Sequence, residues 1–183
     1  FALLLFVSMG LSSQRKNVIF QWDYLAGVPL MYENNFKPEM IKTTTEQTRN
    51  KVSPVSLKVS LTKGIGAIRS EYGTNTKDMP AEIWVGFPVL FPSDYKIDNQ
   101  DLLFTQMQAA PDAGENWGNP PFSIYLHGDV IRTELRSNAA AFDALKTMPP
   151  QERVDIGKLI PGQWIDVVYH IKWGWNKNGT VEI

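Results

Sequence analysis

Two short polar runs in the sequence carry side chains that suit a carboxylate ligand. Arg69 and Glu71 are separated by one residue, and so are Gln106 and Gln108. A guanidinium forms a bidentate pair with a carboxylate, and an amide donates neutral hydrogen bonds. Arg69 is therefore the first candidate to bind an acid group, Gln106 is the second, and Glu71 would orient Arg69. Gln108 is a further candidate site residue, and the alternative for Gln106 and Gln108 is that both are solvated, outward-facing residues. The alternative for the first run is an ordinary, partly exposed ion pair between Arg69 and Glu71.

A third run supplies groups that can transfer a proton. Tyr125 and His127 alternate with apolar residues, so in a strand both side chains lie on one face. Imidazole and phenol groups are common general acids and bases. We expect them to lie beside Gln106 and Gln108 if their strands are neighbours. The alternative for His127, which precedes a Gly-Asp turn, is a solvated turn residue.

Strands must position these side chains, because apolar and polar residues alternate along most of the chain. A single short helix is expected at 139–146, before Pro149 and Pro150. Many strands with Gly and Pro turns predict an all-β fold, an antiparallel β-sandwich with a concanavalin-like jelly roll topology. The expected strands are 55–61 paired with 65–72, then 83–91, 102–108, 122–127 joined by the turn at Gly128 to 130–136, 165–173, and a strand around Val181.

Length and composition limit the possible classes of protein. The chain has 183 residues, of which 43% are hydrophobic and 20% charged, with a formal net charge of -1. This length suits one domain, expected at 14–183. The charge balance gives no basic excess for nucleic acid. Cysteine is absent, so disulfides and thiolate metal sites are excluded.

The N-terminal run 1–7 is apolar and too short to span a bilayer, and small residues follow it at Gly10, Ser12 and Ser13. We predict a truncated signal peptide at 1–13, and hence a secreted or periplasmic protein with no membrane contact after its removal. A buried first strand or helix is the alternative. The pattern at 180–183 stops within a strand, which indicates a domain that is incomplete at its C-terminus.

The order of motifs resembles the heparin-lyase and glucuronan-lyase superfamily of polysaccharide lyases over residues 55–183. The resemblance is carried by Arg69-Ser70-Glu71, Gly86-Phe87-Pro88 to Phe91-Pro92, Gln106, Pro120-Pro121 with the strand after it, Asp155-Ile156-Gly157, Gly162-Gln163-Trp164 and Lys172-Trp173. It implies cleavage of a uronic-acid polymer, such as a glucuronan, heparin-like or alginate-like chain, by β-elimination. In this chemistry, Arg69 and Gln106 would stabilise the enolate that develops at the sugar carboxylate.

The chain departs from the family pattern at the proton-transfer residues. Gln108 stands where the family has a histidine, and an amide is not a useful base. The family's late Tyr and Lys would lie beyond Ile183. We therefore assign proton transfer to His127 and Tyr125 as substitutes.

Further residues are expected to contact the sugar chain. Trp117 and Asn119 lie in the long loop 109–121, and Lys172 lies on the last long strand. Indole rings stack on the apolar face of a pyranose, and the other candidates for this are Trp84, Trp164, Trp173 and Trp175.

The expected partner is an anionic polysaccharide bound by a monomer. No cofactor is required; calcium stays open because oxygen ligands abound, although no EF-hand spacing is present. The competing hypothesis is a lectin-like, non-catalytic carbohydrate-binding jelly roll, which the missing family histidine favours. A retaining glycoside hydrolase ranks last, because no strand carries closely spaced carboxylates.

Overall fold

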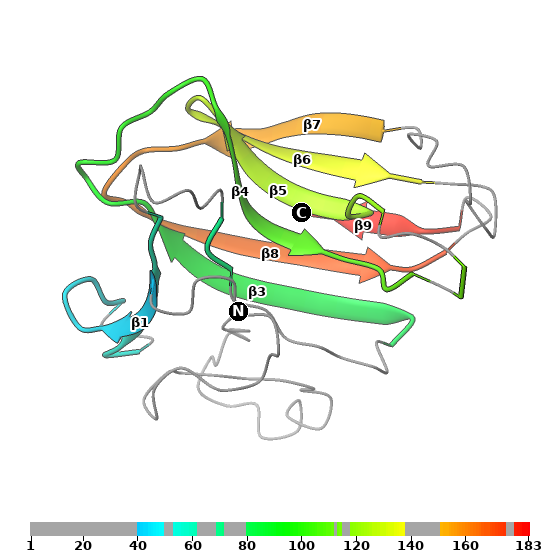
Figure 1. Cartoon of the computed structure of the whole chain (residues 1–183), viewed down its shortest axis with the longest axis horizontal. Helices are drawn as coiled ribbons and strands as arrows, with labels where there is room; N and C mark the ends of the chain where they lie inside the picture. The colour runs from blue at the N-terminus through cyan, green and yellow to red at the C-terminus, as the bar shows by residue number, and fades with distance from the viewer. Residues whose placement is uncertain are drawn as a thin grey trace. The chain divides into compact units, whose positions relative to one another are not determined.

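The computed structural model describes residues 40–49, 53–61, 69–71, 80–111, 113–114, 118–137, 151–174 and 178–183. In this part of the chain it contains nine strands and no α-helix (Figure 1). The predicted all-β, antiparallel fold class is confirmed and is consistent with a β-sandwich; the jelly roll topology stays a prediction. The strands are β1 (Ile41–Thr44), β2 (Ser56–Val59), β3 (Glu82–Leu90), β4 (Asp101–Met107), β5 (Phe122–His127), β6 (Val130–Arg136), β7 (Gln151–Lys158), β8 (Trp164–Lys172) and β9 (Thr180–Glu182).

The chain divides into two compact units, each described below by itself. The first contains the residues up to Val89 and Trp164–His170, and the second contains Leu90–Gln163 and Ile171–Ile183. The predicted signal peptide at 1–13 and the predicted helix at 139–146 lie outside the described residues. Among the residues that are described, no helix has the length and apolar character needed to cross a membrane.

In the first unit, β1 and β2 form an antiparallel pair that runs from Ile41 opposite Val59 to Thr44 opposite Ser56. This pair of β2 with β1 was not expected from the sequence. The described part of the partner predicted for 55–61, residues 69–71, is not in a strand, and 62–68 and 72 lie outside the description. The predicted pairing of 55–61 with 65–72 therefore stays a prediction.

Strands β3 and β8 are neighbours in a sheet ordered β3–β8–β9. One face of β3 and β8 is the core of the first unit, where Val85, Phe87, Val167 and Tyr169 are at most 8% exposed. The rings of Phe87 and Tyr169 meet edge to face, with centroids 6.4 Å apart. Because successive side chains of a strand point to opposite faces, the residues between these buried ones lie on the other face of β3 and β8.

The second unit contains a four-stranded sheet in the order β4–β5–β6–β7, antiparallel at every pairing (Figure 1). Phe122, Ile124 and Leu126 of β5 are at most 1% exposed and form the apolar face with Ile131 of β6. Burial of these side chains is the main stabilising term for the sheet. The other face carries the polar side chains of the same strands.

The turn between β5 and β6 is the predicted one. Gly128 has a φ of 63°, a left-handed conformation that glycine adopts without a steric penalty. The bounds predicted for these two strands, 122–127 and 130–136, agree with the structure. The turn fixes the register of the hairpin, which pairs His127 with Val130 and Tyr125 with Arg132.

The last strand of the sheet, β7, differs from the others because all eight of its residues are exposed. Its pairing with β6 contains a bulge, since Arg132 faces Asp155 whereas the preceding Ile131 faces Gly157. A turn follows at Ile160–Gln163, closed by a hydrogen bond of 3.1 Å from the Gln163 N–H to the Ile160 carbonyl. Gly162 has a φ of 83° there, directly after Pro161, as a type II turn requires.

Candidate functional site

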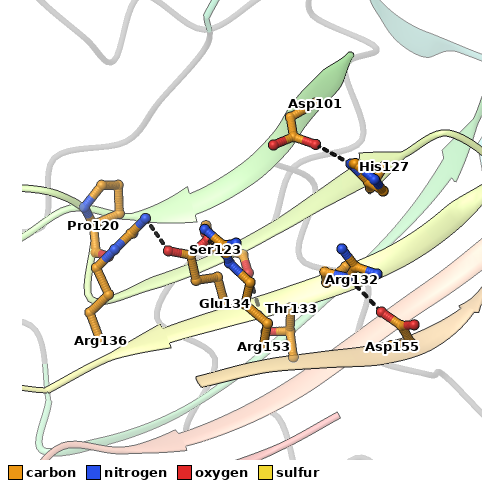
Figure 2. A network of polar contacts seen from close by, with 10 residues as sticks. All are labelled: Asp101, Pro120, Ser123, His127, Arg132, Thr133, Glu134, Arg136, Arg153 and Asp155. Carbon is orange, nitrogen blue, oxygen red and sulfur yellow. Dashed lines mark hydrogen bonds and ion pairs between the residues drawn. The ribbon is translucent and has the colours of Figure 1, made fainter. Parts of the chain in front are cut away.

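The register of the four-stranded sheet places three of the candidate residues, Gln106, Tyr125 and His127, on one face, which we call the polar face. It extends from Asp101 and His127 at one end to Glu134 at the other (Figure 2). Directly opposed residues share a face of a sheet, so each row across the strands brings its side chains together. The polar face consists of Asp101, Gln106, Ser123, Tyr125, His127, Arg132, Glu134, Arg136, Arg153 and Asp155.

An exposed histidine paired with a carboxylate forms the first end of the polar face. His127 Nδ1 lies 2.7 Å from Asp101 Oδ1, and the two residues are directly opposed in the register (Figure 2). The His127 side chain is 51% exposed. When the imidazole is neutral, donation from Nδ1 to Asp101 leaves Nε2 as the nitrogen that accepts a proton. This is the arrangement of an oriented general base.

The middle of the polar face is organised around Arg132. Its Nε donates to Asp155 Oδ1 at 2.5 Å, and its guanidinium also hydrogen-bonds to the Tyr125 side chain. The hydrogen bond from Arg132 lowers the pKa of Asp155, burial opposes this shift, and the charge of His127 adds to it. The same contacts raise the pKa of Arg132. Asp155 is therefore an anion at neutral pH, and it links the guanidinium to the histidine end.

A buried carboxylate between two arginines forms the second end. Glu134 is only 5% exposed and is ion-paired with Arg136 and with Arg153, whose Nε lies 3.2 Å from Glu134 Oε2. Arg136 also donates from Nη1 to the Pro120 carbonyl at 2.9 Å (Figure 2). Two guanidinium groups face one carboxylate, so this end carries a net positive charge. A charge buried this deeply requires such partners.

The predicted neighbourhood of the glutamines and the histidine is only partly correct. Strands β4 and β5 are indeed neighbours, but the register places Gln106 opposite Ser123 and His127 opposite Asp101. Ser123 and His127 are four positions apart on β5, which corresponds to about 13 Å along a strand. His127 therefore does not lie beside Gln106, and Tyr125 lies between the two ends. A register shift in β4 between Leu103 and Thr105 contributes to this offset.

Gln108 has a different position from the one predicted, because its amide is directed to the loop that follows β4. Its Nε2 donates to the Gly118 carbonyl at 3.0 Å and to the Ala109 carbonyl at 3.3 Å. The side chain thereby fastens both ends of the loop beside Asn119, which is exposed. Trp117 lies outside the described residues. These hydrogen bonds position the loop, and the site role predicted for Gln108 stays a prediction.

Arg69 and Glu71 belong to the first unit, and the polar face belongs to the second. Arg69 Nε lies 3.4 Å from Glu71 Oε2, and both side chains are more than one-third exposed. Such a pair fits both interpretations made from the sequence, an oriented guanidinium and an ordinary ion pair. Lys172 is exposed at the end of β8. The roles predicted for these three residues stay predictions.

Sequence reasoning missed the charged residues at the centre of the polar face. Arg132, Glu134 and Arg136 alternate with Thr133 and Leu135 along β6, and they face Asp155 and Arg153 of β7. The signal was present, since three charges at every second position of a strand require a polar face. Within the described ranges, no group of three or more His, Asp or Glu side chains is placed to hold a metal ion.

Comparison with known proteins gives the class of the chain. A family model described as polysaccharide lyase matches residues 17–183. No curated protein and no solved structure matches the chain significantly. Because the family model covers most of the sequence, the chain belongs to the polysaccharide lyase family.

Proposed function

We propose that the polar face binds a polysaccharide containing uronic acid, of the glucuronan, heparin-like or alginate-like kind, and that it cleaves this polymer by β-elimination. The observation that carries the proposal is the row of His127 paired with Asp101 next to the row of Arg132 paired with Asp155. A base and a cation are thus held on one face, a short distance apart. Family membership supports lyase chemistry in general.

The proposed reaction needs three chemical functions. A base removes the proton from the carbon that bears the carboxylate, and the electron pair forms a double bond to the next carbon as its bond to the glycosidic oxygen breaks. The departing oxygen then takes up a proton. A cation near the carboxylate stabilises the enolate that develops as the proton leaves.

The polar face offers a residue for each function. His127 accepts the proton at Nε2, because Asp101 orients its Nδ1. The outer nitrogens of Arg132 hydrogen-bond the sugar carboxylate, while Nε is held by Asp155. Tyr125 is bound to the same guanidinium and donates a proton to the departing oxygen. Tyr125 and His127 are alternate residues of one strand, about 7 Å apart along the chain, so they reach neighbouring atoms of one sugar.

The other end of the polar face suits a further acidic unit of the polymer. Arg153 is 51% exposed and contacts Glu134 through Nε, so the far side of its guanidinium faces solvent. Together with Arg136 it leaves an excess of one positive charge over Glu134. This charge favours anionic over neutral polymers at the polar face. We also propose that the protein acts as a monomer and that it is exported; the apolar N-terminal run supports export.

Incubation with glucuronan, alginate and heparin tests the proposal through the ultraviolet absorbance of newly formed unsaturated ends. We expect absorbance to rise with at least one of the three polymers, and we expect the rate of this rise to fall about 100-fold in His127→Ala. Lys96→Ala, a change at an exposed residue of the same unit, is the matched control and should keep the wild-type rate. Binding of these polymers without any rise in absorbance would select the lectin-like alternative instead.

A further inference from the structure

A second cluster of aromatic and charged side chains lies in the first unit, on the face of β3 and β8 opposite to the core. We propose that Trp84, His170 and Glu82 form an additional carbohydrate-binding platform, which takes a neutral polysaccharide. It involves none of the residues of the polar face. Its test therefore has a readout that does not depend on lyase activity.

The aromatic part of the platform is a parallel stack of two rings. The indole of Trp84 and the imidazole of His170 have centroids 4.2 Å apart and an interplanar angle of 4°. Trp84 is nevertheless 56% exposed, the highest value among the large apolar residues in the described part of the chain. The imidazole covers one side of the indole, and more than half of the Trp84 surface is nevertheless exposed to solvent. A flat exposed ring of this kind matches the apolar C–H face of a pyranose.

The stack is held in place by a charged hydrogen bond. His170 Nε2 lies 2.7 Å from Glu82 Oε1, and the His170 side chain is only 14% exposed. Glu82 and Trp84 are alternate residues of β3 and hence lie on one face, next to His170 on the neighbouring strand β8. The indole is thereby fixed before a ligand arrives. Prior ordering reduces the entropy that binding would otherwise lose.

The charges around the platform favour a neutral ligand. Glu82 is 56% exposed beside the stack, so it can accept hydrogen bonds from sugar hydroxyls. Further along the same face of β8, Asp166 is held by Arg49, with Nη2 and Oδ2 2.7 Å apart. Lys172 is exposed two residues beyond His170 on this face, so the two cations Arg49 and Lys172 balance the two carboxylates Asp166 and Glu82. The face therefore has no excess of positive charge to attract a uronate chain, in contrast to the Glu134 end of the polar face.

Electrophoresis in native gels that contain xyloglucan, mixed-linkage β-glucan or galactomannan tests the proposal. We expect at least one of these neutral polymers to retard the wild-type protein. Trp84→Ala should weaken that binding about tenfold, and Trp84→Phe should keep a measurable part of it, because phenylalanine also stacks. Leu61→Ala, which removes another exposed apolar side chain of this unit, is the matched control and should bind like the wild type.

Two further measurements separate the platform from the lyase site. Trp84→Ala should keep the thermal unfolding temperature of the wild type, and it should release unsaturated ends at the wild-type rate from short oligomers of the uronic polymer that the wild type cleaves. Glu82→Gln, which loses the charge that orients His170, should also weaken binding of the neutral polymer. The proposal is overturned if none of the three polymers retards the wild type, or if Trp84→Ala binds as well as the wild type does.

Discussion

The two ends of the polar face use charge in opposite ways. At the Glu134 end, a carboxylate that is 5% exposed is enclosed by two arginines. At the His127 end, an imidazole and a carboxylate that are each at least half exposed form a single pair. The buried cluster cannot exchange protons without losing its partners, whereas the exposed pair can. The difference indicates that the Glu134 end mainly stabilises the fold, whereas the His127 end is suited to proton transfer.

The largest effect is expected from removal of the buried carboxylate. Glu134→Ala leaves Arg136, which is 15% exposed, without its ion pair. We expect a loss of about 3 kcal/mol in the free energy of unfolding, measured by urea denaturation. Asp129→Ala removes the partner of Lys158 in an exposed pair and should cost at most about 0.5 kcal/mol. Equal losses in the two variants would show that the Glu134 cluster is not structurally special.

The opposite pattern is expected at the histidine end. His127→Ala should lower kcat on the cleaved polymer about 100-fold, because the general base is lost. Its free energy of unfolding should change by less than about 0.5 kcal/mol, since the side chain is exposed. Asp101→Asn should give an intermediate loss of kcat together with a displaced pH–rate profile. A profile identical to that of the wild type would remove Asp101 from its orienting role.

Gln108 occupies the sequence position at which the resemblance leads us to expect a histidine. It follows β4 on the side of the Glu134 end. Gln108→His should fail to restore activity to His127→Ala, because the side chain is directed to the Gly118 carbonyl. Recovery of kcat in the double variant would instead place the reacting sugar beside Gln106. Gln108→Ala alone should raise KM a few-fold by releasing the loop, with a stability loss of about 1 kcal/mol.

The smallest effect concerns acid stability at the middle of the polar face. The hydrogen bond from Arg132 lowers the pKa of Asp155 below 3.8, so Asp155 stabilises the fold above that pH. This contribution is lost as the pH falls from 3.8 through the lower pKa of the folded state. The difference in urea midpoint between the wild type and Asp155→Asn should be constant from pH 7 to about pH 5 and then shrink toward zero in acid. A difference that grows in acid would contradict this sign.

Local alternation was sufficient to predict β4, β5 and β6, whereas β7, which carries Arg153 and Asp155 of the polar face, was not among the expected strands. The runs 122–127 and 130–136 agree with β5 and β6, and the turn at Gly128 lies between them as expected. The runs 83–91, 102–108 and 165–173 are each displaced by one residue from β3, β4 and β8. Burial of alternate side chains is a property of the individual strand, so the sequence contains it directly.

The pairing between distant strands could not be predicted in the same way. The placement of His127 opposite Asp101 depends on the register of β4 with β5 and on its shift between Leu103 and Thr105. The pairing of β2 with β1 depends likewise on a choice between distant segments. The register and the partner of a strand are determined by many cross-strand contacts together, and the local sequence pattern does not contain this information.

The exposed outer strand β7 has a consequence for the behaviour of the protein in concentrated solution. In the sheet as described it is the terminal strand, and it carries charges at Glu152, Arg153, Asp155 and Lys158 as well as a bulge. Unprotected strand edges recruit further chains into intermolecular sheets, and charges and bulges oppose this. Two of these charges, Arg153 and Asp155, also belong to the polar face. The residues proposed to hold a polymer thus also help to keep neighbouring molecules from aggregating.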